Sequence, residues 1–368
     1  MIRARLFRNV RLICLVTALM PLGIAAPAAA AGSVVPAGTA SGKKLTLKKT
    51  AAQAKKPTAA QKRRAQRAAA ARARAAAQAK ALKEAQEPKF KLDELGALVP
   101  DVRAAAAIIY NPENGQVLWE SNARDLRSIA SITKVMTAIV FLEGEPDLTQ
   151  KVTIQASDVR NASTTYLRSG YIVTKEDLLH LLLIASDNAA ARALARVSPH
   201  GAQGFIARMN EKAKELGLAN TTYADPSGLL AANVSSAYDM ARLITFVSGD
   251  ERIAAIMRKQ NHTVIAGRRT INIHSTNQLV RQGEIDVQAG KTGFISKAGY
   301  CLATLLRLPG GGPQVAVVVL GAQSNAGRFW ETRHLLNWLS SKTSDLFGAK
   351  VEAATPAAAA VAAPGGSN

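Results

Sequence analysis

The chain has 368 residues, 48% of them hydrophobic, which is enough for a sizeable core in one large domain or two small ones. Its formal net charge is +21, but residues 43–91 hold 16 Lys and Arg against two acids, whereas residues 92–368 hold 27 basic and 24 acidic residues. A nucleic-acid-binding domain is expected to be basic in its folded part. The near-neutral C-terminal bulk therefore argues against that class.

Residues 1–31 have the pattern of a secretory signal peptide. Four arginines precede the apolar run Leu12–Met20, and a stretch of small residues ends at Ala31. The apolar run is shorter than the roughly 20 residues of a membrane-spanning helix, so we expect cleavage near Ala31 and export to the periplasm. The alternative is a retained membrane anchor.

Residues 32–91 form a basic linker of Ala, Lys, Arg and Gln. The stretch Ala51–Lys83 is rich in helix formers but has no apolar stripe, which predicts a solvated, partly helical or disordered extension. Such a linker can also contact an anionic wall polymer or a membrane surface. Nucleic acid is the least favoured partner, because the leader directs export and the basic run lacks aromatic residues for base stacking.

Residues 92–347 are predicted to form the folded domain, and the Ala/Pro-rich tail 348–368 is expected to be disordered. The domain is expected to begin with a strand Ala104–Tyr110, a turn 111–115 and a return strand Gln116–Glu120. A helical region from Ser131 to about Met257 follows. Strands are expected to return only after Val287, as Tyr300–Leu308 and Gln314–Ala322, and a final helix capped by Asn325 reaches about Leu346. Within the helical region, Thr174 and Asp177 predict the start of a helix over Lys175–Ile184. This order suggests one sheet covered by helices, with its N- and C-terminal strands adjacent.

A first chemical pattern is Ser131-Ile-Thr-Lys134, directly before an apolar helical run. Residues three apart on a helix share a face, so Lys134 can reach Ser131 and, if neutral, accept its proton. A serine at a helix N-terminus also lies where backbone N–H groups favour developing negative charge. Alone the pattern is weak, because Ser41-Gly-Lys-Lys44 in the linker matches it too.

A second pattern, Ser186-Asp-Asn188, ends an apolar helix. Ser186 is a candidate to pass a proton to a leaving amine, and Asn188 to hold a substrate amide. Ordinary helix punctuation is the alternative, because all three residue types are common caps.

The third pattern is Lys291-Thr-Gly293, followed by Phe294. On a strand edge, Lys291 and Thr292 would offer a cation and a hydroxyl to a substrate carboxylate. Gly293 would let a substrate backbone approach closely. The alternative is a Gly-rich turn with a solvated lysine.

The three patterns together, in this order, are the signature of penicillin-binding proteins and class A β-lactamases. The sequence resembles the low-molecular-mass penicillin-binding proteins, which are serine D-alanyl-D-alanine peptidases. The segments 222–229, 236–239, 289–295 and 298–301, together with Asn233, also resemble that family. The resemblance implies an α/β fold of the α+β type, with an antiparallel sheet flanked by helices and an inserted helical lobe, as in β-lactamases and transpeptidases.

The resemblance also implies a mechanism. Ser131 attacks the carbonyl of a D-Ala residue in a peptidoglycan stem peptide, and Lys134 is the base. Ser186 relays a proton, and the N–H groups of Ser131 and Phe294 form the oxyanion hole. Asn188, Lys291 and Thr292 bind the substrate, and β-lactams act as covalent inhibitors. No cofactor or metal is expected, and none of the five histidines has a zinc-binding spacing such as H-x-x-x-H.

Within this family the chain looks most like the D-alanyl-D-alanine endopeptidase branch, similar to penicillin-binding protein 7, because only 75 residues follow Gly293. Carboxypeptidases of the group usually add a C-terminal β domain, and a D-alanyl-D-alanine carboxypeptidase is the main alternative. A β-lactamase would need a deacylating glutamate, for which the candidate is Glu215, expected on a helix surface. A non-enzymatic penicillin sensor or wall-binding module is a further alternative.

Overall fold

The computed structural model describes residues 58–342, so the leader and the tail lie outside the described residues. The chain divides into two units, Met1–Lys62 and Arg63–Asn368, and helix α1 (Ala59–Gln86) begins in the first. The side chains of α1 that the structure describes are exposed. Its Ala, Lys, Arg and Gln residues are strong helix formers, which accounts for a long helix without an apolar face.

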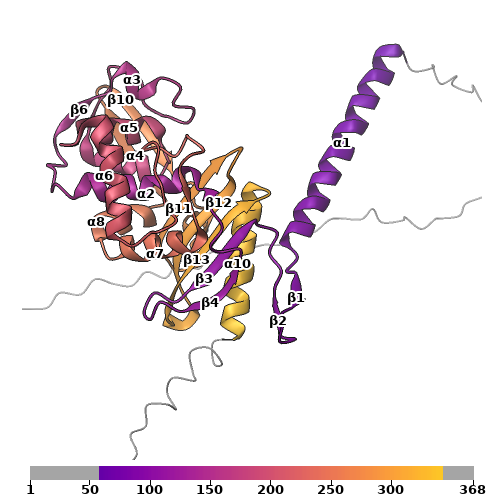
Figure 1. Cartoon of the computed structure of the whole chain (residues 1–368). Coiled ribbons are helices and arrows are strands. Elements are labelled where there is room, and N and C mark those ends of the chain that lie inside the picture. The colour runs from indigo at the N-terminus through magenta and orange to yellow at the C-terminus, as the bar shows by residue number, and fades with distance from the viewer. Residues whose placement is uncertain (1–57, 343–368) are drawn as a thin grey trace, which may run out of the picture. The chain divides into compact units, whose positions relative to one another are not determined.

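Five antiparallel strands form the central sheet of the second unit (Figure 1). Their order across the sheet is β11 (Val287–Ile295), β12 (Gly299–Arg307), β13 (Gln314–Ala322), β3 (Ala106–Tyr110) and β4 (Val117–Ser121). Strand β3, from the start of the domain, pairs with β13, from its end. The predicted adjacency of the N- and C-terminal strands is therefore confirmed, and β11 lies at an edge.

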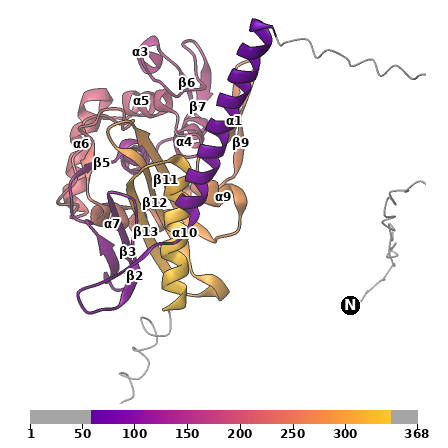
Figure 2. The same cartoon turned by 90° about the vertical axis from the view of Figure 1, so that its right-hand side faces the viewer.

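Alternate residues of the sheet point into two separate hydrophobic cores. In β13, Val318 and Leu320 belong to the core beneath the helical lobe, whereas Val317 and Val319 belong to the core beneath α10 (Asn325–Ser341). The period of two in a strand produces this division. Helix α10 packs on β12 and β13 (Figure 2), and α7 packs on the same strands with the other core.

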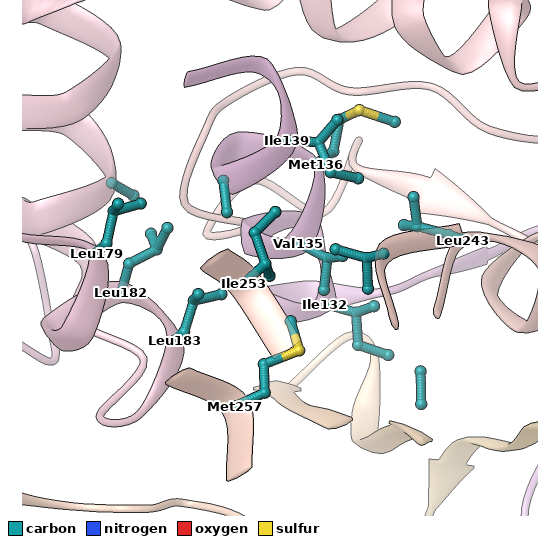
Figure 3. Packing of buried hydrophobic residues seen from close by; sticks show 14 of the residues in the cluster. Ile132, Val135, Met136, Ile139, Leu179, Leu182, Leu183, Leu243, Ile253 and Met257 are labelled. Atoms are coloured by element: carbon teal, nitrogen blue, oxygen red, sulfur yellow. The ribbon is translucent and has the colours of Figure 1, made fainter. Parts of the chain in front are cut away.

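The helical lobe is inserted between β4 and β11. Its helices are α2 (Lys134–Leu142), α3 (Ala156–Val159), α4 (Lys175–Leu183), α5 (Asn188–Val197), α6 (Gly201–Glu215), α7 (Ala237–Ser248) and α8 (Glu251–Arg258). The short helix α9 (Gln278–Gln282) follows them in the chain and contributes Leu279 and Val280 to the core beneath α10. Helix α2 is buried along its whole length. Figure 3 shows its side chains Val135 and Met136 among residues of α4, α7 and α8. This packing fixes α2, and with it the segment that precedes it.

Several expected elements differ from the structure. Short strand pairs interrupt the helical region, and a hairpin precedes Val287. Within that region, β8 (Val234–Ser235) pairs with β5 (Arg127–Ser128), and β6 (Lys151–Thr153) pairs with β7 (Ile172–Thr174). The hairpin is β9 (Asn261–Ala266) with β10 (Arg269–His274), and a further pair, β1 (Phe90–Leu92) with β2 (Leu98–Pro100), precedes the first predicted strand. The prediction that strands return only after Val287 was wrong, because the β9–β10 hairpin precedes that residue. Gly267, at φ +63°, allows the two-residue turn that joins the two strands of the hairpin.

The helix ends also test the sequence-based expectations. The Thr174 side chain accepts a hydrogen bond from the Asp177 N–H and α4 begins at Lys175, which confirms that prediction. At α10 the cap is Ser324, whose hydroxyl accepts from Gly327 N, and Asn325 is already helical. That helix ends at Ser341. Within residues 58–342, no helix combines the length and the apolar character that crossing a bilayer requires.

Candidate active site

Ser131 lies in a short 3-10 turn, η1 (Ala130–Thr133), immediately before α2. The sequence predicted a helix N-terminus here, and the structure places the serine one turn ahead of the α-helix proper. The backbone of Ala130 has φ +47°, a conformation that L-residues seldom adopt. The turn is fixed by its surroundings, since Ile129 donates its N–H to Asn233 O at 3.1 Å.

The amine of Lys134 is fully buried and contacts three oxygen atoms. Its Nζ lies 2.9 Å from Ser131 Oγ, 2.6 Å from Asn188 Oδ1 and 2.5 Å from Ser227 O. The amide of Asn188 is itself oriented, because its Nδ2 donates to Ala162 O at 2.7 Å. The first and second sequence patterns therefore meet at one nitrogen.

These contacts decide the direction of the proton between Ser131 and Lys134. A neutral amine has two N–H groups and one lone pair, and two of its three partners here are carbonyl oxygens that only accept. The N–H groups go to Asn188 and Ser227, which leaves the lone pair for the Ser131 hydroxyl. Burial lowers the pKa of Lys134 to about 7, against the opposing effect of the Asp225 and Asp187 carboxylates. A neutral, proton-accepting Lys134 is thus accessible near neutral pH.

The second pattern forms the connection between α4 and α5. Ser186 has φ +60°, a strained value for a residue with a side chain. Asp187 holds this connection, since its two carboxylate oxygens accept from Ala190 N at 2.9 Å and Tyr166 N at 2.6 Å. Asn188 begins α5. The helix-punctuation reading is therefore correct for Asp187, while its two neighbours face the site.

The third pattern lies on the edge strand β11, as predicted. Lys291 is buried and donates to Ser186 Oγ at 2.7 Å, so the second and third patterns also meet. Burial, together with the positive charges of Lys134 and Arg328, holds the pKa of the Lys291 amine well below its ordinary value. The Thr292 hydroxyl lies 2.6 Å from that of Thr276.

Gly293 is required by a contact within the chain itself. A Cβ at this position would lie 2.7 Å from Ile129 O and 3.2 Å from Ser131 N. The close packing of β11 against η1 is thus a reason for the glycine that the sequence did not indicate, and the approach of a substrate backbone stays a prediction. Next to it, Phe294 is half-exposed and stacks on Tyr300 with ring centroids 4.2 Å apart.

These segments enclose a cleft of about 490 Å³. Six of the eight predicted site residues line it, namely Ser131, Ser186, Asn188, Thr292, Gly293 and Phe294. The two lysines lie directly behind the lining, each in contact with one of its serines. The structure thus brings all eight predicted residues together.

Other residues of the site were missed by the sequence reasoning. Thr276 and Arg328 line the cleft, and Ser227 provides the third partner of Lys134. Arg328 donates to Gly293 O at 3.0 Å and to Cys301 O at 3.1 Å, which ties α10 to β11 and β12. Its position follows from the packing of the last helix, which no local pattern indicates. In the described part of the chain, no group of three or more His, Cys, Asp or Glu side chains is arranged to hold a metal ion.

The resemblance implies that a penicillin acylates Ser131, and Gly293→Ala is expected to slow this acylation about a hundredfold, because β11 or η1 must move by a fraction of an ångström. Acylation is measured by mass spectrometry, and the fold is checked by circular dichroism. Gly144→Ala is the control, since its Cβ would meet only Pro199 Cγ at 3.8 Å. An unchanged acylation rate in a folded Gly293→Ala protein would contradict the packing argument.

Comparison with known proteins agrees with this geometry. Residues 93–324 match the model of the D-alanyl-D-alanine carboxypeptidase family. The D-alanyl-D-alanine endopeptidase of Escherichia coli is 32% identical over 246 residues, which cover 66% of this chain and 79% of that protein. The carboxypeptidase DacC of the same organism is 33% identical over 65% of this chain and 62% of that protein.

Among solved structures, the Streptomyces K15 DD-transpeptidase superposes with a TM-score of 0.61 at 28% identity, covering 65% of this chain and 97% of that one. The fold is therefore the one shared by DD-transpeptidases and penicillin-binding proteins, as the sequence predicted. With its family model matched over more than half of its length, the chain belongs to the D-alanyl-D-alanine carboxypeptidase family, the S11 family of serine peptidases.

Proposed function

We propose that this protein is an exported serine DD-peptidase that hydrolyses D-Ala peptide bonds in peptidoglycan stem peptides, with Ser131 as nucleophile and Lys134 as its base. One observation supports this most directly. The Lys134 Nζ lies 2.9 Å from Ser131 Oγ, and its two other partners are carbonyl oxygens that only accept, so the lone pair of the neutral amine is left for the serine hydroxyl. This is the arrangement that nucleophilic catalysis by a serine requires.

In the proposed acylation step, Ser131 Oγ bonds to the carbonyl carbon of a D-Ala residue as its proton moves to Lys134. The oxyanion that forms faces the backbone N–H groups of Ser131 and Phe294, which lie on the facing segments η1 and β11. The C–N bond then breaks, and the departing amine takes, through Ser186, the proton that Lys134 accepted, which leaves Lys134 neutral again. Water hydrolyses the ester, which releases the shortened peptide and restores the serine.

The substrate carboxylate is assigned to the Lys291 end of the cleft. Arg328 provides positive charge there, Lys291 provides a buried amine, and Thr292 provides a hydroxyl. A bound carboxylate would raise the lowered pKa of Lys291 and favour its charged form. A β-lactam presents a carboxylate and a strained amide in the same relative places, so it is expected to acylate Ser131.

The endopeptidase branch is favoured within the family. The match to the Escherichia coli endopeptidase extends over 79% of that protein, compared with 62% for the carboxypeptidase DacC. We therefore propose the cross-link between stem peptides as the substrate, with the terminal D-Ala of an uncross-linked stem as the alternative. Both substrates place a carboxylate beside the scissile amide, so Lys291 and Thr292 serve either one.

A β-lactamase is disfavoured by the position of Glu215. This glutamate lies on the surface of α6, outside the cleft lining. Hydrogen bonds from Arg208 and Lys212 lower its pKa to about 2, so it is a poor base for deacylation. The sensor alternative has no specific support, because the nucleophile, the base and the cleft are all present.

The basic helix α1 is proposed as a contact for an anionic wall polymer or a membrane surface. Its eight basic side chains point in all directions around the helix axis, against one acidic residue, Glu84. No face of the helix is apolar, so such a contact would be electrostatic. The proposed signal peptide, residues 1–31, lies outside the described residues, and export is inferred from its sequence.

The substrate assignment is tested with two substrates in parallel, a cross-linked stem-peptide dimer and an uncross-linked pentapeptide. We expect the purified protein to cleave the dimer, with products identified by mass. Pre-treatment with penicillin and the Ser131→Ala substitution should each abolish cleavage. Release of D-Ala from the pentapeptide with the dimer untouched would make the protein a carboxypeptidase. Cleavage of neither, with Ser131 still acylated by penicillin, would favour the sensor.

The pH dependence of acylation tests the role of Lys134. Because the pKa of Lys134 lies at about 7, the amine loses its ability to accept a proton as the pH falls below that value. The rate of acylation by penicillin should rise between about pH 6 and pH 8 and then level off. Lys134→Arg, which cannot become neutral, should lower the rate by about a thousandfold. A flat profile for the unmodified protein over this range would contradict the proposal.

The contact of α1 is tested by sedimentation with isolated peptidoglycan and, separately, with vesicles of anionic lipid. Substituting Arg63, Arg64 and Arg67 by Gln should weaken sedimentation and reduce its salt dependence, because fewer counterions are displaced. Cleavage of soluble stem peptides should be unaffected. If the unmodified protein and the variant sediment equally at low salt, both with peptidoglycan and with the vesicles, α1 is only a solvated linker.

A further inference from the structure

Asp225 belongs to the segment that supplies the third partner of Lys134, and the mechanism above assigns it no task. Its carboxylate accepts four hydrogen bonds from one turn of chain. Oδ2 accepts from the backbone N–H of Ser227 at 2.9 Å and from the Ser227 hydroxyl. Oδ1 accepts from Leu230 N at 3.1 Å and from Asn233 Nδ2 at 2.5 Å. The turn is thus wrapped around a single carboxylate.

This turn packs directly on the nucleophile's own segment. A Cβ at Gly228, which has φ +78°, would lie 2.1 Å from Ala130 O and 2.9 Å from Ser131 N. The carbonyl of Pro226 accepts from Thr137 Oγ1 of α2 at 2.6 Å. A change in the conformation of this turn would therefore displace both η1 and the Ser227 carbonyl that contacts Lys134.

The carboxylate also has an electrostatic effect on Lys134. Burial raises the pKa of Asp225, but hydrogen bonds from Ser227, Leu230 and Asn233 together lower it by more than burial raises it. The carboxylate is therefore charged at neutral pH. The other charges that act on Lys134 are Asp187, which favours its ammonium form, and Arg192, which opposes it. Lys291 also interacts with Lys134, as a second buried amine.

We propose that Asp225 is a positioning residue: it holds the Ser227 carbonyl against the Lys134 amine, and its charge stabilises the ammonium that forms when Lys134 takes the Ser131 proton. This inference rests on the proposed role of Lys134 as base. In the acylation step a positive charge appears at a fully buried nitrogen, which is costly without a negative partner. The Ser227 carbonyl supplies a dipole at 2.5 Å, and Asp225 supplies the full charge behind it.

The test is the pH profile of penicillin acylation for Asp225→Asn in the whole protein. Without the carboxylate, the ammonium form of Lys134 is less stable, so the midpoint of the profile should move to lower pH by about one unit. The plateau rate should fall about tenfold, because the charge that develops on Lys134 is less well compensated. Asp225→Glu keeps the charge, so the midpoint of its profile should lie between that of Asp225→Asn and that of the unmodified protein.

Asp239→Asn is the matched control. Asp239 is also buried and also holds a loop, since its Oδ2 accepts from Asn220 N and Thr221 Oγ1, both at 2.8 Å. It is not among the charges that act on Lys134. Its substitution should lower the melting temperature while leaving the midpoint of the profile unchanged.

Three outcomes would overturn the inference. The first is an Asp225→Asn profile that is lowered at every pH with the same midpoint, which would indicate a structural role alone. The second is an unchanged plateau and midpoint. The third is failure of both Asp225→Asn and Asp225→Ser to fold, which would assign the carboxylate to the fold. If the unmodified protein shows no midpoint near pH 7, the role of Lys134 as base fails, and this is a separate result.

Discussion

The burial of one lysine amine is the constraint on which the rest of the site depends. A charged ammonium in this position would lose its hydration, and the three oxygen atoms around Lys134 replace water only in part. The pKa therefore falls to about 7, and the neutral amine that the proposed base requires becomes accessible near neutral pH. The same burial requires that its partners be held rigidly, because each comes from a different part of the chain.

The fold meets this requirement by close backbone contacts. Glycines at 228 and 293 allow the Asp225 turn and strand β11 to approach η1 from two directions. Helix α2, buried on all sides, fixes Lys134 from a third direction. A second buried amine, Lys291, repeats the arrangement across the cleft with Ser186 as its partner. The site is a meeting point of η1, the α4–α5 connection, the Asp225 turn and β11, and none of these segments forms it alone.

Local pattern explains what could be predicted from the sequence. The spacing of Ser131 and Lys134 follows from helical periodicity, and the apolar segment Gln314–Ala322 was predicted as a strand with the bounds that β13 has. The three motifs and their order indicated the family before any contact was known. Asp225 and Arg328 could not be found in this way, because their contacts depend on how distant segments pack. The β9–β10 hairpin was missed although a local signal was present, since Gly267 opens a two-residue turn between its strands.

The position of the covalent bond that penicillin forms tests the central claim most directly. The protein is treated with penicillin, digested, and its peptides are sequenced by mass spectrometry. We expect a single adduct on Ser131, retained in Ser227→Ala and absent in Ser131→Ala. An adduct on another serine, such as Ser186, or an adduct that persists in Ser131→Ala, would show that the buried Lys134 amine serves a different group and would contradict the account.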